Sequence, residues 1–160
     1  MRLEGTFSVE PEGPSQPDVR ALLQEADSYA AALYPPESIH ALDIEALTDP
    51  AVRFVVARLN GTAVGSGALV LGEGGCAELK RMFVTEKMRG HGIGRAVLHV
   101  LEQIAHRENM SLVRLETGVK QPDAINLYKR LGYTECDPFE PYRSDPYSVF
   151  MEKRLAARQR

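Results

Sequence analysis

Three glycines alternate in the stretch Lys87–Leu101, KMRGHGIGRAVLHVL, immediately before a helical pattern begins. Glycine in or beside a helix costs up to about 1 kcal/mol relative to alanine, so Gly90, Gly92 and Gly94 need a local reason. The first turn of a helix has unpaired N–H groups and a partial positive charge, which together bind phosphate. Because glycine leaves these N–H groups uncovered, the stretch predicts a phosphate-binding turn at the start of a helix.

Two well-known phosphate-binding motifs do not match this glycine loop, Arg89–Arg95. A dinucleotide-binding loop needs Gly-x-Gly-x-x-Gly, and its third glycine position, counted from Gly90, holds Arg95. A P-loop ends in Gly-Lys-Ser/Thr, whereas here Gly94 is followed by Arg95 and Ala96. The remaining alternative is a tight strand-to-helix turn with no ligand.

Strand and helix patterns lie on both sides of the glycine loop. Before it, β-rich runs at Val52–Leu59 and Ala63–Leu71 are joined by Asn60-Gly61, which is typical of a hairpin, and another strand is expected at Cys76–Val84. The other expected elements are strands at Thr6–Val9, Leu112–Glu116 and Ser148–Leu155, and helices at Asp18–Leu33, about Pro36–Leu47, Ile93–Arg107 and about Pro122–Leu131. This order predicts an α/β fold with a mixed, mostly antiparallel central sheet and helices on both faces.

Length and composition indicate one globular domain spanning residues 1–160, with 44% hydrophobic and 26% charged residues. The formal net charge of −3 provides no basic field, so we expect no nucleic-acid partner. Cys76 and Cys136 are too few for a disulfide framework, which suits a reducing cytoplasm, and the histidines show no metal-ligand pattern. No apolar run approaches the roughly 18 residues that span a bilayer. We therefore expect a cytoplasmic protein without metal or membrane partner.

Arg89-Gly-His-Gly-Ile-Gly94 resembles the Arg/Gln-x-x-Gly-x-Gly/Ala motif of the GCN5-related N-acetyltransferase (GNAT) family, including its place between a strand and a long helix. Glu78–Val84, ELKRMFV, looks like the family's fourth strand, and Ala124–Tyr133, AINLYKRLGY, resembles its Ala-x-x-Leu-Tyr-x-x-x-Gly-Phe/Tyr segment. Three further segments resemble a bacterial subgroup of small acetyltransferases: Pro35–Leu42, Leu115–Gly118 and Asp145–Met151. The resemblance implies acetyl-CoA as donor, a small-molecule or peptide amine as acceptor, and direct transfer in a ternary complex.

The resemblance also implies a donor site along the fourth strand and the glycine loop. Main-chain N–H groups of the loop would bind the CoA pyrophosphate, and two arginine side chains would add charge-assisted contacts. Backbone groups of the strand would pair with the pantetheine arm, and an N–H near its end would hold the thioester oxygen. Gln121 stands where the family often has an asparagine. The implied donor residues are Met82, Phe83, Val84, Arg89, Gly90, His91, Gly92, Ile93, Gly94, Arg95, Gln121 and Tyr128.

Transfer to an amine also needs an acid and a base. Tyr128, the tyrosine of the Leu-Tyr segment, is the candidate acid for the CoA thiolate, since a weak donor suffices for a thiol. Glu78 is the leading candidate base, and Glu116 is the second candidate for base or for binding the amine. His40 and Arg143 are candidate acceptor-binding residues, Arg143 by binding a carboxylate. A water chain remains an alternative base.

Strict alternation along Cys76–Val84 places Glu78, Lys80, Met82 and Val84 on one face, and Leu79, Arg81 and Phe83 on the other. Charges on both faces of a covered strand indicate a polar cleft, although Glu78 and Lys80 also suit a simple ion pair. Two other functions stay open at this stage: a non-catalytic acyl-CoA-binding or sensor module, and an NAD-binding oxidoreductase. A homodimer through an apolar sheet edge is a further expectation.

Overall fold

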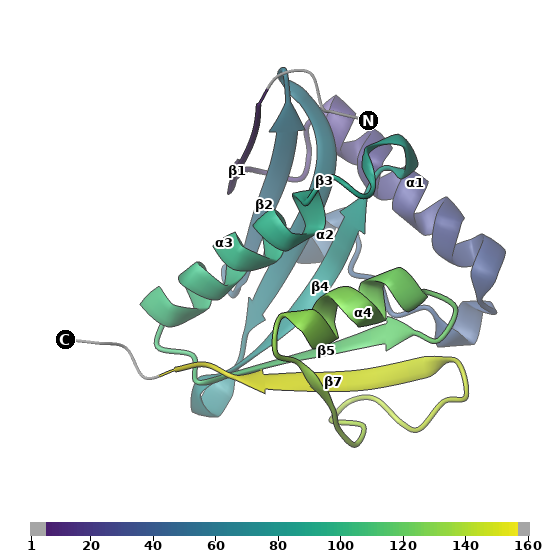
Figure 1. Ribbon diagram of the computed structural model, residues 1–160, viewed down its shortest axis with the longest axis vertical. Coiled ribbons are helices and arrows are strands. Elements are labelled where there is room, and N and C mark those ends of the chain that lie inside the picture. The colour runs from purple at the N-terminus through teal and green to yellow at the C-terminus, as the bar shows by residue number, and fades with distance from the viewer. Residues whose placement is uncertain (1–5, 157–160) are drawn as a thin grey trace.

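The computed structural model describes residues 6–156, so both ends of the predicted 1–160 domain lie outside the described part. Within this range one sheet has the strand order β1-β2-β3-β4-β5-β7-β6 and carries four α-helices (Figure 1). The strands are β1 (Phe7–Pro11), β2 (Val52–Leu59), β3 (Thr62–Leu71), β4 (Cys76–Val84), β5 (Leu112–Gly118), β6 (Thr134–Glu135) and β7 (Ser148–Arg154). The helices are α1 (Pro17–Leu33), α2 (Ile44–Leu47), α3 (Ile93–Arg107) and α4 (Pro122–Arg130). β4 and β5 run parallel, and the other neighbouring pairs run antiparallel.

The helices cover both faces of the sheet, as predicted. Phe54 and Val56 of β2 pack with Val19 of α1 in one buried cluster. Their neighbours Val55 and Ala57 belong to a second cluster with the apolar face of α3. Since successive side chains of a strand point to opposite faces, the continuous apolar run of β2 is explained by burial on both sides.

Most of the predicted elements are confirmed, and the strand Cys76–Val84 and the helix Ile93–Arg107 are confirmed at both ends. The hairpin turn has φ of 51° at Asn60 and 82° at Gly61, as a two-residue turn between twisted strands requires. β6 was not predicted, because two exposed residues carry no periodic pattern.

The predicted helix over Pro36–Leu47 is wrong. The chain forms a short 3-10 turn at Pro36–Ser38, continues without regular structure, and begins α2 only at Ile44, where Asp43 caps the N–H of Ala46. The intervening carbonyl groups bind side chains of β4 instead of helical N–H groups. Lys80 Nζ donates to the carbonyl of His40, and Arg81 Nε donates to that of Leu42 at 2.7 Å. Tertiary hydrogen bonds therefore replace the helix here.

The predicted alternation along β4 is wrong beyond Lys80, because a β-bulge interrupts the strand. Arg81 has φ of 57°, and Gly67 of β3 faces both Arg81 and Met82 in the register. The buried Ser66 hydroxyl donates to the Arg81 carbonyl at 3.0 Å and holds this bulge. After the extra residue, Met82 and Val84 pack toward α3 rather than beside Lys80.

β4 and β5 separate at their carboxyl ends. Their parallel pairing runs from Cys76 with Leu112 to Leu79 with Leu115, although both strands continue. The two strands visibly diverge beyond this point in Figure 1. The bulge of β4 lies just beyond the last pair, so the sheet opens beside its only parallel junction in the described range.

Candidate active site

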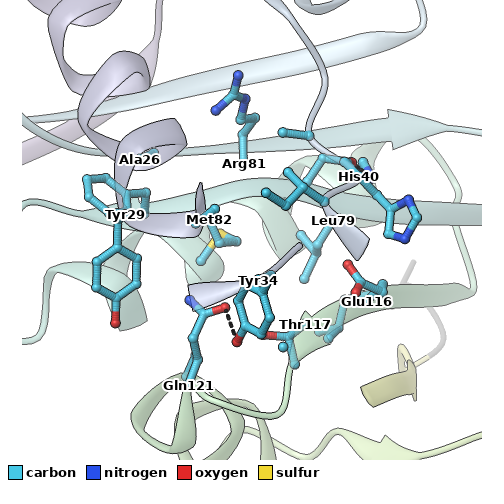
Figure 2. A pocket seen from close by; sticks show the side chains of 18 of the residues that line it. Ala26, Tyr29, Tyr34, His40, Leu79, Arg81, Met82, Glu116, Thr117 and Gln121 are labelled. Atoms are coloured by element: carbon cyan, nitrogen blue, oxygen red, sulfur yellow. Dashed lines mark hydrogen bonds between the residues drawn. The ribbon is translucent and has the colours of Figure 1, made fainter. Parts of the chain in front are cut away.

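A cavity lies where β4 and β5 separate. Its wall includes Leu79–Phe83 of β4, Leu115–Gly118 of β5, and side chains from α4. The carboxyl-terminal half of α1 and part of the segment after it, including Tyr34 and His40, line the cavity from the other side (Figure 2). The cavity thus collects residues from four separate parts of the sequence.

Glu116 lines this cavity from β5. Its Oε2 accepts a hydrogen bond from the Ser148 hydroxyl at 2.7 Å. Burial raises the pKa of the Glu116 carboxyl above its ordinary value, while the Ser148 hydrogen bond and the positive side chains around it act in the opposite direction. Figure 2 shows Glu116 and His40 at the same end of the cavity. The arrangement provides a desolvated carboxylate that is able to take a proton.

Tyr128 lines the same cavity from α4, and only 6% of the residue is exposed. Ala124, one helical turn earlier, lies in the same wall, as the helical spacing of the Ala-x-x-Leu-Tyr segment requires. Burial raises the pKa of Tyr128, and the charge of Glu116 adds to that effect. The phenol therefore keeps its proton throughout the physiological pH range.

Glu78 is not among the described residues that line this cavity. Its carboxylate accepts a hydrogen bond from the Tyr142 hydroxyl, and Lys80 Nζ lies 3.7 Å away. Tyr142 also accepts a hydrogen bond from Lys80 and packs edge-on against the His40 ring, with ring centroids 5.2 Å apart. Tyr142 was not among the residues predicted from the sequence, where its only signal was its place in the aromatic and charged loop before β7.

The two cationic side chains of β4 in the cavity wall both form contacts that hold neighbouring segments of the protein. Lys80 is bound by the His40 carbonyl and Tyr142, as described above. The Arg81 guanidinium forms an ion pair with Asp27 of α1 at 2.6 Å, and only 7% of the Arg81 side chain is exposed. Glu116 thus differs from these residues, because its partner, Ser148, is neutral.

The glycine loop enters α3 with two left-handed residues. Gly90 and Gly92 both have φ of 81°, and a Cβ at either position would meet no atom within 4 Å. Gly92 is the N-cap of α3, and the first helical hydrogen bond joins the Ala96 N–H to its carbonyl. The N–H groups of Ile93, Gly94 and Arg95 precede that bond and are the unpaired donors of a helix start. This open turn fits a phosphate group.

Arg89 is placed beside aromatic rings of the neighbouring elements. Its Nε donates to the Val84 carbonyl at 3.1 Å, and its guanidinium carbon lies 4.6 Å from the ring centroid of Tyr29 and 5.5 Å from that of Phe83. Arg95 is exposed on the first turn of α3, and His91 is half-buried in the loop. Of the predicted donor residues, Met82, Phe83, Gln121 and Tyr128 line the cavity, whereas Val84 and those from Arg89 to Arg95 do not.

The predicted acceptor residues are separated in the structure. His40 lies in the cavity wall, whereas Arg143 is exposed on the loop before β7 and does not line the cavity. That loop is fixed at Asp145, which accepts hydrogen bonds from the Ser38 hydroxyl at 2.7 Å and from the Tyr147 N–H at 2.8 Å. These two contacts lower the pKa of Asp145. The Asp145 contacts connect the loop to the segment after α1.

No group of three His, Cys, Asp or Glu side chains in residues 6–156 is arranged to hold a metal ion. The described helices also include none with the length and apolar character needed to cross a bilayer.

The sequence model of the Acetyltransferase (GNAT) family matches residues 17–133. The chain belongs to the GNAT family. This match contains the glycine loop, β4 and the α4 segment, so the resemblance based on those motifs is confirmed. The expected fold class agrees as well.

Known GNAT proteins resemble this chain over nearly its whole length. An Azospirillum brasilense protein named IAA acetyltransferase is 48% identical over 145 residues, covering 90% of this chain and 95% of that protein. The N-acetyltransferase YedL of Escherichia coli is 32% identical, with coverage of 93% and 95%. A crystal structure from Klebsiella pneumoniae, assigned as an acyl-CoA N-acyltransferase, shares 35% identity and superposes with a TM-score of 0.79, covering 94% of this chain and 98% of that one. These relatives support an acyltransferase enzyme.

Proposed function

We propose that the protein moves the acetyl group of acetyl-CoA to a primary amine by direct transfer in a ternary complex. The observation that carries this proposal is that Glu116 and Tyr128 line one cavity at the separated ends of β4 and β5. One residue is suited to take a proton and the other to give one. The family of the chain and the names of its relatives are consistent with this chemistry.

Acetyl-CoA would bind along β4 and the start of α3. Unpaired N–H groups at Ile93–Arg95 and the open turn at Gly90 and Gly92 suit its pyrophosphate. Backbone groups of Met82–Val84 lie beyond the last β4–β5 pair and suit the amides of the pantetheine arm. Bound in this way, acetyl-CoA would extend from the glycine loop along β4 toward Tyr128.

Glu116 is the better candidate for the base. A base has to reach the ammonium group of the acceptor, and Glu116 lies in the cavity wall. Its raised pKa makes it a stronger proton acceptor than an exposed carboxylate. Glu78 is bound by Tyr142 and lies beside Lys80, which suits a role in holding the loop before β7. We assign Glu78 to that role and Glu116 to proton removal.

Tyr128 would complete the reaction as the acid. The donor supplies an acetyl thioester, so a C–N bond forms with the amine and the C–S bond breaks. Glu116 takes the proton that the ammonium group loses before attack, and Tyr128 gives its proton to the departing sulfur. A thiol has an ordinary pKa near 8.5, so a weak acid such as this phenol is sufficient. As the amide forms, the attacking nitrogen loses a second proton, which restores the Tyr128 phenol, and the proton on Glu116 passes to solvent.

A ligand titration tests whether the protein binds the proposed donor, before any reaction is measured. The melting temperature of the purified protein is followed with acetyl-CoA, CoA and NADH, because a ligand that binds the folded state stabilises it by RT ln(1 + [L]/Kd). Stabilisation by the CoA compounds alone supports the proposal and leads to a screen of primary amines as acceptors. No stabilisation by either CoA compound would reject the proposed donor. Binding without transfer to any amine would favour a CoA-binding module instead.

A further inference from the structure

Tyr34 connects the end of α1 to the loop between β5 and α4. Its hydroxyl oxygen accepts the Lys120 N–H at 3.1 Å and its proton is donated to Gln121 Oε1 at 3.3 Å. The residue is 8% exposed, and its ring lies so close to Gly118 that a Cβ there would overlap the hydroxyl. The position of this hydroxyl is therefore fixed from several directions.

This contact sets the orientation of the Gln121 side chain. A carboxamide has an acceptor end and a donor end, which differ only in the atom that each presents. Because the Lys120 N–H is directed at the phenol oxygen, the phenol proton points to Gln121 and selects its oxygen as partner. Figure 2 shows the amide oxygen turned toward Tyr34 and the amide nitrogen on the other side. Within residues 6–156 the Gln121 amide nitrogen donates to no other group, so its N–H donors are available to a ligand.

The place of Gln121 identifies which part of the donor those N–H groups meet. Gln121 lines the cavity together with Met82 and Phe83 of β4, which are assigned above to the pantetheine arm. No residue from Arg89 to Arg95 lines this cavity, so the site of the pyrophosphate is separate from it. An N–H donor beside the arm complements an amide carbonyl of that arm.

We propose that Tyr34 is a positioning residue of the donor site, which holds Gln121 so that Gln121 Nε2 donates a hydrogen bond to a carbonyl oxygen of the pantetheine arm. The inference rests on the proposed function, because it needs CoA as ligand. It also explains why glutamine stands at position 121, where the family often has asparagine: the longer side chain would reach both the Tyr34 hydroxyl and the arm.

Calorimetric titration with CoA tests the inference without relying on turnover. Tyr34→Phe keeps the ring but frees the Gln121 amide, so we expect the Kd for CoA to rise about three- to tenfold, the size of one hydrogen bond. Gln121→Glu keeps an oxygen for Tyr34 but removes every N–H, so it should weaken CoA binding at least as much. The pair Tyr34→Phe and Gln121→Ala should bind CoA no more weakly than Gln121→Ala alone, because both changes remove one interaction.

Two comparisons separate this role from a general loss of structure. 3′-Phospho-ADP retains the pyrophosphate and lacks the arm, so Tyr34→Phe should leave its Kd unchanged. Tyr133→Phe also removes a buried phenol, one that donates to Glu102 at 2.8 Å outside the cavity, and should leave CoA binding unchanged. Unaltered CoA binding in Gln121→Glu, or equal weakening of 3′-phospho-ADP binding in Tyr34→Phe, would overturn the inference. Absence of CoA binding by the wild type would instead reject the proposed function.

Discussion

The hydroxyl of Tyr34 occupies the space that a Cβ atom would need at Gly118. Gly118 ends β5 and Tyr34 directly follows α1, so this contact joins two elements that are far apart in sequence. The close approach of the ring requires a residue without a side chain at the end of β5.

Gly118→Ala should therefore lower the free energy of unfolding by about 2 to 3 kcal/mol, as overpacking of a buried site does. Urea denaturation measures the change. Gly13→Ala is the control, because a Cβ at Gly13 would meet no atom within 4 Å, and it should stay within about 0.5 kcal/mol of the wild type. Equal stability of the two variants would contradict the tight packing.

Tyr128→Phe should lower kcat about 100-fold or more and leave the Kd for CoA nearly unchanged, since the proposed acid acts mainly in the transition state. Stopped-flow measurement of thiol release under saturating donor reports the step. Because burial raises the pKa of Tyr128, its own ionisation should not limit the rate at the alkaline end of the neutral range. An unchanged rate where chemistry is limiting would exclude this role.

Glu116→Gln and Glu78→Gln should separate the two candidate bases. We expect Glu116→Gln to lower kcat at least 100-fold, as removal of a general base does, and Glu78→Gln to have a much smaller effect. The wild-type rate should also fall as the pH drops through the raised pKa of Glu116. Steady-state kinetics from pH 5 to 9 provide the comparison, and the opposite order of the two variants would reinstate Glu78.

The ionised Glu116 carboxylate should also lower the free energy of unfolding at neutral pH. Burial raises its pKa in the folded state, so the folded protein retains this proton to higher pH than the unfolded chain. The stability that this group contributes is present below its ordinary pKa and is lost as the pH rises through the folded pKa. Glu116→Gln should therefore be more stable than the wild type at pH 8, with a smaller difference at pH 4. Urea titrations at both pH values measure it, and a pH-independent difference would be inconsistent with this origin.

Gly92→Glu should weaken CoA binding about tenfold or more by placing a negative charge beside the pyrophosphate site. Gly74→Glu is the matched control, since Gly74 also has a positive φ, 69°, and no atom within 4 Å of a Cβ. Both variants carry the same charge change and similar backbone strain, so only the first should alter the calorimetric Kd. Similar Kd values for both would remove the phosphate assignment from the glycine loop.

The sequence predicted the elements whose patterns are local. The apolar face of α3 and the turn at Asn60 and Gly61 depend on neighbours in the chain, and both were found correctly. The segment after α1 was predicted as a helix, and this prediction is wrong. The hydrogen bonds that its carbonyl groups accept from Lys80 and Arg81 come from residues about 40 positions away, which the local sequence does not reveal. Such competition leaves no periodic signal.

The candidate site could be predicted only in part, and the reason is similar. Tyr128 and Gln121 were found through a motif, and the structure places both in the cavity wall. Glu78 was favoured as base from its strand alone, but its partner Tyr142 lies 64 residues away. The bulge at Arg81 depends on Ser66 of another strand, so single-strand alternation could not reveal it. Side-chain roles that depend on two distant segments need the folded chain.

The divergence of β4 from β5 has the effect of creating a free strand edge inside the protein. Exposed edges normally invite pairing with other chains, and proteins protect them with charges, bulges or covering elements. Here residues of α1 and α4 line the same cavity as this edge, and under the proposed function the pantetheine arm would pair with it as an added strand does. Because such pairing would use main-chain atoms, the side chains of this edge could change without loss of the donor, and acceptor choice could then change independently of donor binding.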